Sequence, residues 1–267
     1  EESVKGFITR GALFQEMGFN YIGPVDGHDL PLLIEVLQNI KKMNGPILLH
    51  CRTEKGKGLK VAEDDPLKYH GITPQMLKKA DEEGTARPAK AALPEAPVKT
   101  FTDAFVDGLL AAAKNDPRVC AITAAMPTGT GLHKFEQAHP QRFFDVGIAE
   151  QHAVTFAAGL AAQGMRPVAA IYSTFLQRGY DQLLHDVAIQ NLPVVFAIDR
   201  AGLVGEDSPT QNGTFDISFL RCVPGLKICA PRDEVDTRLM MQWALKQDGP
   251  VAVRYARGKA PNIGPTD

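Results

Sequence analysis

Several loops combine charged and aromatic residues directly after segments that have the pattern of buried strands. Glu150 lies in the run Asp145-Val-Gly-Ile-Ala-Glu-Gln-His152, at the expected start of a helix after a strand Phe143–Val146. Its apolar neighbours predict tight surroundings, where desolvation disfavours the ionised carboxylate, so that Glu150 could act as a hydrogen-bond donor or an acid. An acidic residue at a helix start is also commonly only a cap or a partner of the helix dipole, and spacing alone favours that alternative.

The run Tyr172-Ser-Thr-Phe-Leu-Gln-Arg178 is a second candidate for chemistry, because it follows a buried strand. An aromatic ring in this position can stack on a flat heterocycle, and an arginine can clamp a phosphate with two hydrogen bonds. The alternative is a core aromatic beside a solvated arginine. Arg200, Arg254 and Arg257 also stand at strand ends, and arginines from several strand ends favour an anionic, phosphorylated ligand.

Alternating strands and helices must position these residues. From Phe101 onward we expect helices at Thr102–Lys114, Glu150–Ala162, about Phe175–Gln190 and Glu234–Leu245, separated by strands. The six expected strands are Val119–Thr123, Phe143–Val146, Pro167–Ile171, Pro193–Ile198, Leu226–Cys229 and Val251–Tyr255. This alternation predicts an α/β domain with a doubly wound parallel sheet, whose ligands bind beyond the carboxyl ends of the strands.

The first 60 residues predict the end of a second α/β domain. A strand Phe19–Ile22, a helix through Leu32 to Ile40 and a strand Pro46–His50 follow one another. The amino-acid composition then changes, and from about Gly56 to Val98 the chain is rich in proline and charged residues. We interpret this part as a linker or wrap-around segment. The predicted organisation is therefore residues 1–60 as the last part of one domain, 61–100 as linker and 101–267 as the doubly wound domain.

Composition excludes several classes of function. The formal charge of −2 gives no reason to expect binding to nucleic acid or to an anionic membrane, and no apolar run is long enough to span a bilayer. The four scattered cysteines indicate neither a zinc site nor a disulfide framework, so we expect a cytoplasmic protein with reduced thiols. The run Val25-Asp26-Gly27 is only weakly similar to a diphosphate-binding loop. The start without Met is typical of a processed or excised piece.

Four runs of sequence resemble the 1-deoxy-D-xylulose-5-phosphate synthase family. They span Gly18–Asp29, Asp145–Phe156, Ile171–Arg178 and Ala197–Gly202, and they occur in the right order. The resemblance covers essentially the whole chain and is weakest at about Glu82–Val98. It implies that residues up to about 60 belong to the family's diphosphate-binding domain and residues 101–267 to its transketolase-like, pyrimidine-binding domain.

The resemblance also implies roles for particular residues. Glu150 and His70 match catalytic positions, and Glu150, Phe175 and Ile148 match positions that bind thiamine diphosphate. The positions associated with the acceptor phosphate are Tyr172, Arg178, Arg200, Arg257 and Asp207. One departure is evident, since the family usually reads Asp-Gly-x-Thr-His where this chain has Asp207-Ser-Pro-Thr-Gln211. A glutamine cannot shuttle protons near neutral pH as a histidine can, so steps that rely on that histidine are in doubt.

The implied activity is a transferase reaction of isoprenoid and thiamine biosynthesis. Pyruvate would be decarboxylated with thiamine diphosphate, and the two-carbon unit would pass to glyceraldehyde 3-phosphate in a homodimer. The family holds Mg²⁺ and the cofactor diphosphate with a Gly-Asp-Gly segment and a downstream Asn, which this chain lacks. We therefore expect the metal ligands outside it. Two alternatives stay open: an inactive fragment, or the pyrimidine-domain subunit of a split transketolase or 2-oxo-acid dehydrogenase.

Overall fold

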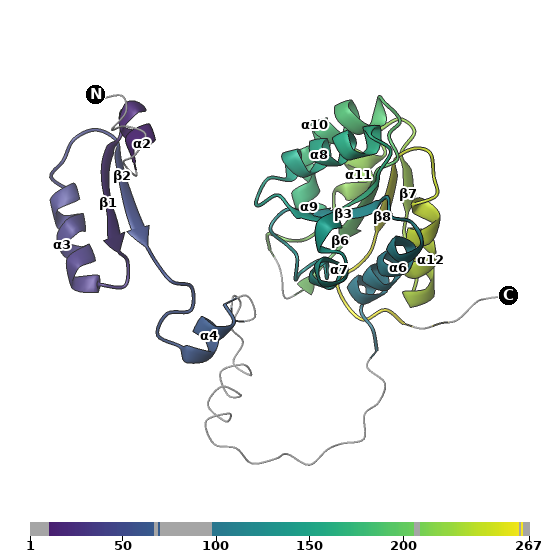
Figure 1. The fold of residues 1–267 in the computed structure, drawn as a ribbon, viewed down its shortest axis with the longest axis horizontal. Helices are drawn as coiled ribbons and strands as arrows, with labels where there is room; N and C mark the ends of the chain where they lie inside the picture. The colour runs from purple at the N-terminus through teal and green to yellow at the C-terminus, as the bar shows by residue number, and fades with distance from the viewer. Residues whose placement is uncertain (1–10, 67–68, 70–97, 206–208, 262, 264–267) are drawn as a thin grey trace, which may run out of the picture. The chain divides into compact units, whose positions relative to one another are not determined.

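The computed structural model describes residues 11–66, 69, 98–205, 209–261 and 263. The chain divides into two compact units, Glu1–Lys90 and Ala91–Asp267, which we call the N-terminal and the C-terminal unit (Figure 1). The domain limits inferred from the sequence stay a prediction. No helix in the described part of the chain is both long and apolar enough to cross a membrane.

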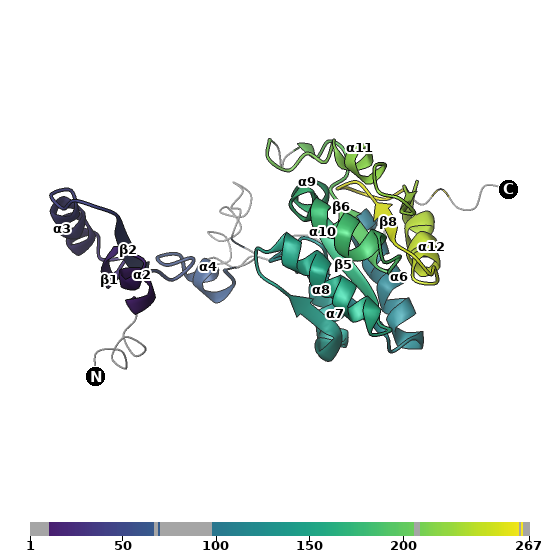
Figure 2. The ribbon, with the colours of Figure 1, turned by 90° about the horizontal axis from the view of Figure 1, so that it is seen from above.

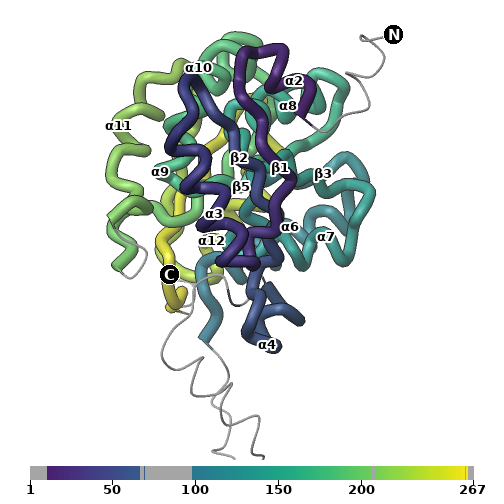
Figure 3. The backbone as a smooth tube through the Cα atoms, turned by 90° about the vertical axis from the view of Figure 1, so that its left-hand side faces the viewer, coloured from purple at the N-terminus to yellow at the C-terminus, as the bar shows by residue number. Residues whose placement is uncertain are grey.

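The N-terminal unit is built on two parallel strands, which lie side by side with a helix next to them in Figure 3. Its elements are α2 (Ala12–Glu16), β1 (Asn20–Asp26), α3 (Leu30–Ile40), β2 (Ile47–Arg52) and α4 (Lys60–Asp64). The Asp29 side chain caps α3 by accepting the N–H of Leu32 at 3.1 Å. The order strand, helix, strand confirms the predicted α/β character of this part.

This unit leaves much of its apolar surface uncovered. Helix α3 has no buried residue, and its Leu30 and Ile34 are 62% and 54% exposed. Leu13 and Met17, in or next to α2, are 69% and 63% exposed. The short helix α4 lies inside the segment that we predicted to be linker, and residues 70–97 of that segment lie outside the described residues.

Six parallel strands form the sheet of the C-terminal unit, in the order β4-β3-β5-β6-β8-β7. The strands are β3 (Val119–Thr123), β4 (Phe143–Asp145), β5 (Arg166–Tyr172), β6 (Val195–Asp199), β7 (Lys227–Cys229) and β8 (Val251–Arg254). The first of them, β3, lies inside the sheet, and crossovers lead outward from it in both directions. This topology confirms the predicted doubly wound sheet. Strands β3 and β6 are buried at every residue, as a parallel sheet covered on both faces requires.

Helices cover both faces of this sheet, and Figure 2 shows α6 and α12 on one side with α8 and α10 on the other. The α-helices of the unit are α6 (Phe101–Asn115), α7 (His133–Ala138), α8 (Glu150–Ala162), α9 (Ser173–Leu176), α10 (Tyr180–Gln182), α11 (Asp216–Leu220) and α12 (Glu234–Ala244). Because successive strand side chains point to opposite faces, Ala121 packs in the core under α6 and Ile122 in the core under α8.

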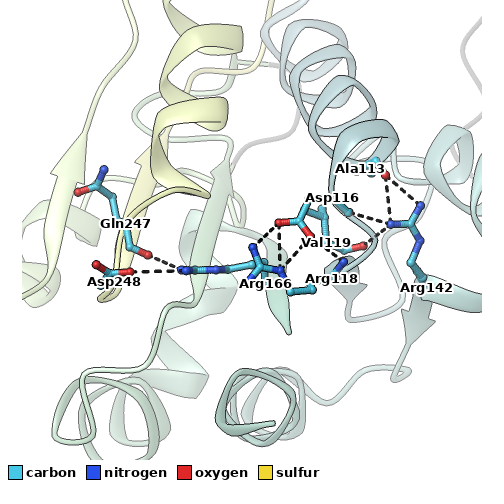
Figure 4. A network of polar contacts seen from close by, with 8 residues as sticks. All are labelled: Ala113, Asp116, Arg118, Val119, Arg142, Arg166, Gln247 and Asp248. Atoms are coloured by element: carbon cyan, nitrogen blue, oxygen red, sulfur yellow. Dashed lines mark hydrogen bonds and ion pairs between the residues drawn. The ribbon is translucent and has the colours of Figure 1, made fainter. Parts of the chain in front are cut away.

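Helix α6 has well-defined ends. The Thr100 and Asp103 side chains form a reciprocal capping box at its start. Beyond its last turn, Arg142 donates to the carbonyl oxygens of Ala113, Asp116 and Val119 at 3.1 to 3.2 Å (Figure 4). A cation at this point gives the Ala113 carbonyl, in the last turn of α6, a donor from outside the helix and stabilises the negative end of the helix dipole.

One predicted helix differs in its details. We expected a single α-helix at about Phe175–Gln190, but the segment consists of α9, the 3-10 helix η2 (Gln177–Gly179), α10 and the π-helix η3 (Leu183–Ala188). The change of hydrogen bonding occurs where the chain meets α8. A Cβ atom on Gly179 would lie 3.0 Å from Val154 Cγ2, so the segment packs closely on α8 at this point.

Candidate functional site

The C-terminal ends of the parallel strands bring the candidate residues to one edge of the sheet. Glu150 begins α8 shortly after β4, Tyr172 ends β5, Arg200 follows β6, and Arg257 comes three residues after β8. The strand order places β5 and β6 next to each other at the centre of this edge. We call the residues around Tyr172 and Arg200 the central cluster.

Glu150 is a buried carboxylate at the first turn of α8. Its residue is 3% exposed, and no side chain caps the helix start. The Oε2 atom is buried and accepts no hydrogen bond from the residues that the structure describes, but Arg178 Nη1 lies 3.2 Å from it. Half of the Arg178 side chain, 52%, remains in solvent. A buried acceptor at the site edge is thus held by one exposed cation.

Part of the expected environment of Glu150 was wrong. Tight apolar surroundings were predicted from its sequence neighbours, yet Ile148 is 77% exposed. The segment after β5 packs closely on the backbone here, since a Cβ atom on Gly179 would lie 3.3 Å from the Glu150 carbonyl oxygen. Ile148 projects from this edge as an apolar side chain in solvent.

The central cluster is organised around the ring of Tyr172, which is 8% exposed. Phe175 stacks on it with ring centroids 5.6 Å apart and an interplanar angle of 17°. The Arg200 guanidinium carbon lies 3.7 Å from the Tyr172 centroid, which is cation–π geometry. Phe175 and Arg200, from two different strand-end segments that we predicted, therefore both contact Tyr172.

Gly129 permits this arrangement. A Cβ atom built on Gly129 would lie 1.7 Å from the Tyr172 hydroxyl oxygen, so only glycine fits in the loop after β3. The Gly129 carbonyl also accepts a hydrogen bond from Arg200 Nη1 at 3.2 Å. We did not predict a role for Gly129, although it lies in the loop Thr123–Gly131 that follows a strand.

Asp199, the last residue of β6, is fully buried beneath Arg200. Its Oδ1 accepts the Arg200 backbone N–H at 2.7 Å, and its Oδ2 accepts the Thr102 hydroxyl at 2.8 Å. Burial raises the pKa of this carboxyl to about 6, against the opposing effects of Arg200, Thr102 and Arg257. Sequence reasoning missed Asp199 and Thr102. Asp199 lies within the motif Ala197–Gly202, but nothing in the sequence points to Thr102.

The remaining arginines differ in their partners. Arg254 forms an ion pair with the buried carboxylate of Asp216, with its Nε 2.8 Å from Oδ2, so it has a structural partner. Arg257 is exposed and donates to the Val204 carbonyl oxygen at 3.4 Å, in the loop that starts at Arg200. His70 and Asp207 lie outside the described residues.

The N-terminal unit has a polar cleft of about 350 Å³ at the carboxyl ends of its two strands. The lining residues are Pro24, Val25, Asp26, His28, Arg52, Thr53, Glu54 and Lys57. His28 Nε2 accepts the Glu54 N–H at 2.7 Å, and Lys57 pairs with the Glu54 carboxylate at 2.6 Å. Among the residues that the structure describes, no group of three or more His, Cys, Asp or Glu side chains could hold a metal ion.

A doubly wound sheet with a buried glutamate and stacked aromatic residues at its carboxyl edge is typical of cofactor-binding α/β domains. Residues 98–262 match the family described as transketolase, pyrimidine binding domain. Because this match covers more than half of the chain, the chain belongs to that family. Residues 1–53 match the family described as 1-deoxy-D-xylulose-5-phosphate synthase.

Curated relatives agree with both matches. The chain is 55% identical over 264 residues to 1-deoxy-D-xylulose-5-phosphate synthase of Nitrosomonas eutropha, with 98% of the chain covered. It is 52% identical over 267 residues to the protein of the same name from Aquifex aeolicus, with 100% covered. In both cases the chain spans 41% of the relative's length.

Solved structures share the fold. A split gene transketolase, described as an inactive beta4 tetramer, is 26% identical with a TM-score of 0.56, covering 62% of this chain and 54% of that one. A transketolase from Campylobacter jejuni is 20% identical with a TM-score of 0.56, covering 96% of this chain and 49% of that one. The second likeness shows the fold alone.

Proposed function

We propose that this chain is part of a 1-deoxy-D-xylulose-5-phosphate synthase and contains its pyrimidine-binding domain. The enzyme would remove CO₂ from pyruvate and transfer the two-carbon unit to glyceraldehyde 3-phosphate. One observation carries the proposal: Glu150 is a buried carboxylate whose Oε2 lacks a hydrogen-bond partner among the described residues, in a chain 52–57% identical to enzymes of that name.

The residues present fit the pyrimidine half of thiamine diphosphate. Oε2 of Glu150 is buried and accepts no hydrogen bond within the described residues, although Arg178 Nη1 lies 3.2 Å from it, and a ring N–H of a ligand would supply the missing donor. The half-buried ring of Phe175 offers a stacking face, and the exposed Ile148 an apolar contact. When bound, this cofactor supplies the electron sink that lets CO₂ leave a 2-oxo acid.

The role of Glu150 in this proposal is to hold a proton at the pyrimidine ring. Its burial excludes water from the carboxyl group, so the hydrogen bond forms in surroundings where electrostatic interactions are strong. Arg178 contacts Glu150 from the solvent side and keeps exposed surface for an anion. His70 is proposed as the second catalytic residue, from its match to the family alone.

The acceptor phosphate would bind at the carboxyl edge of the sheet, where the arginines near the central cluster meet solvent. The Arg200 side chain is 12% exposed and lies over the Tyr172 ring, whereas Arg178 and Arg257 are exposed. Guanidinium groups bind phosphate with paired hydrogen bonds, so three of them around one edge favour a phosphorylated substrate. Asp207 is proposed for the same site, and the Gln211 position puts proton transfer there in doubt.

We further propose that the protein works as a homodimer that pairs diphosphate-binding and pyrimidine-binding domains, with Mg²⁺ and the cofactor diphosphate held outside this chain. The uncovered apolar side chains of the N-terminal unit agree with a domain that is larger than residues 1–60.

Glu150→Gln in the full-length protein tests the proposal. With thiamine diphosphate and Mg²⁺, deuterium exchange at the reactive carbon of the cofactor should fall by about 10²–10⁴ fold, the range for removing an acid–base group. The fold should persist, because Gln is nearly isosteric and Arg178 is half exposed. Exchange equal to that of the wild type would remove Glu150 from the role.

A second candidate is the pyrimidine-domain subunit of a split transketolase, favoured by the 26% identity to the split gene transketolase structure. Identification of the product from pyruvate and glyceraldehyde 3-phosphate separates the two. Formation of 1-deoxyxylulose 5-phosphate supports the synthase. Absence of that product with the full-length protein and its cofactors refutes it.

A further inference from the structure

We infer that Asp199 is a positioning residue for the acceptor phosphate, acting through Arg200 and held in place by Thr102. This inference rests on the proposed function and deepens it, because it names the residues that orient one arginine of the phosphate site. Asp199 is 0% exposed, so it cannot touch a substrate itself. Its effect must pass through the groups that it contacts.

The first of these contacts fixes the Arg200 backbone. Arg200 has a φ of 60°, in the left-handed region that a side chain other than glycine rarely adopts. The Asp199 Oδ1 atom accepts the Arg200 N–H at 2.7 Å in this conformation. On the other side, a Cβ atom on Gly213 would lie 2.3 Å from the Arg200 carbonyl oxygen, so the chain is held closely there as well.

The second contact concerns charge. Arg200 Nη1 lies 3.5 Å from Asp199 Oδ1 and also donates to the Gly129 carbonyl, while the guanidinium covers the Tyr172 ring. Asp199 is thus a buried anion beneath an arginine side chain that is only 12% exposed, and opposite charges attract strongly where water is excluded. The guanidinium is held between the ends of β3, β5 and β6, at the edge where we place the phosphate.

Thr102 completes the arrangement from α6. Its hydroxyl donates to Asp199 Oδ2 at 2.8 Å, across 97 positions of sequence. Its Cγ2 atom packs close to Gly131, where an added Cβ atom would lie 3.2 Å from it. Valine at this position keeps the methyl contact and loses the hydroxyl, whereas serine keeps the hydroxyl and loses the methyl group. The two substitutions therefore separate the hydrogen bond from the packing.

The experiment measures steady-state kinetics of the full-length protein with two acceptors, glyceraldehyde 3-phosphate and D-glyceraldehyde. Asp199→Asn should raise KM for the phosphorylated acceptor by about tenfold or more, as expected when a charged group no longer orients its partner. KM for D-glyceraldehyde and KM for pyruvate should stay within about twofold of wild type, because neither carries the phosphate. Thr102→Val should change KM in the same direction, and Thr102→Ser should retain wild-type values.

Tyr255→Phe is the matched control. Tyr255 is buried near Asp199, and its hydroxyl has no hydrogen-bond partner in the described part of the chain, so its removal should leave all three KM values unchanged. Equal rises for both acceptors, or no change in Asp199→Asn and Thr102→Val, would overturn the inference while the synthase stands. If Asp199→Asn does not fold, the two Thr102 variants decide. A wild-type protein without synthase activity would overturn the proposed function and this inference together.

Discussion

Gly129→Ala is the substitution whose effect the structure defines most sharply. The new methyl group would lie 1.7 Å from Tyr172 Oη and 2.9 Å from Cζ, well inside van der Waals contact. Tyr172 cannot move away without disturbing Phe175 at 5.6 Å or Arg200 at 3.7 Å. Loss of the cation–π contact costs about 0.5–2 kcal/mol and loss of the stacking about 0.5–1.5 kcal/mol.

These costs agree with the usual range for overpacking a buried site, about 1–3 kcal/mol. We therefore expect Gly129→Ala to lower the free energy of unfolding by about 1–3 kcal/mol, or Tm by about 2–4 °C per kcal/mol. Urea denaturation of the full-length protein measures the first quantity and calorimetry the second. KM for glyceraldehyde 3-phosphate should rise as well, because Arg200 loses its support.

Two comparisons control this prediction. In the double variant Gly129→Ala with Tyr172→Phe the clashing hydroxyl is gone, so the two changes should be less damaging together than the sum of each alone. Gly159→Ala adds a methyl group in the exposed middle of α8, with nothing within 4 Å, and should stabilise by about 0.5–1 kcal/mol. Wild-type stability of Gly129→Ala, or strict additivity in the double variant, would refute the reasoning.

Three further predictions concern the C-terminal unit. Arg142→Ala should lower the free energy of unfolding by about 1.5–3 kcal/mol, because the carbonyl oxygens of Ala113, Asp116 and Val119, between the last turn of α6 and the start of β3, lose a charged donor. Urea titration checks this, with Arg142→Lys as the milder variant. Burial raises the pKa of Cys120 to about 12, so at pH 8 iodoacetamide should modify the exposed Cys222 and leave Cys120 untouched in the folded protein, as read by peptide mass spectrometry. Burial raises the pKa of Asp199 to about 6, beside Arg200 and Arg257 and with Tyr255 nearby, so the folded state binds this proton more tightly than the unfolded chain. The stability contribution of Asp199 therefore falls as the pH rises from about 4 to about 6. Over that interval Asp199→Asn should gain stability relative to the wild type, as measured by urea titrations at fixed pH.

The regular elements could be predicted because they depend on local patterns. Strand β3 and helix α8 have the bounds that the sequence predicts, Val119–Thr123 and Glu150–Ala162. A continuous apolar run predicts a strand buried on both faces, and the loop after such a strand predicts the edge where ligands bind. The segment after Tyr172 could not be predicted in the same way, because its apolar pattern does not distinguish the α-helical, 3-10 and π-helical turns that it contains.

The contacts between particular side chains of the site could not be predicted from the sequence, because they depend on packing. Thr102 and Asp199 are 97 residues apart, and their hydrogen bond exists only because α6 begins beside the end of β6. Glu150 and Arg178 come from consecutive crossovers of the sheet, and their 3.2 Å contact depends on the same approach of α8 to the segment after β5. Residue types indicated what each side chain could do, but packing decided with which partner.

The arginines show how far a strand-end position can serve as an indicator of a ligand. Arg200, Arg254 and Arg257 gave one prediction, since each stands at or just beyond a strand end. Helix α11 then supplies Asp216 to Arg254, and a buried ion pair of this kind is strongly disrupted when one partner is taken away. An anionic substrate would have to compete with that carboxylate, whose Oδ2 lies 2.8 Å from Arg254 Nε; the Asp199 carboxylate lies further from Arg200, at 3.5 Å, and the Arg200 guanidinium also covers the Tyr172 ring. Arg254 donates to both carboxylate oxygens of Asp216, through Nε and Nη2, so we do not expect it to bind a phosphate. A strand-end position therefore does not by itself identify an arginine of an anion site.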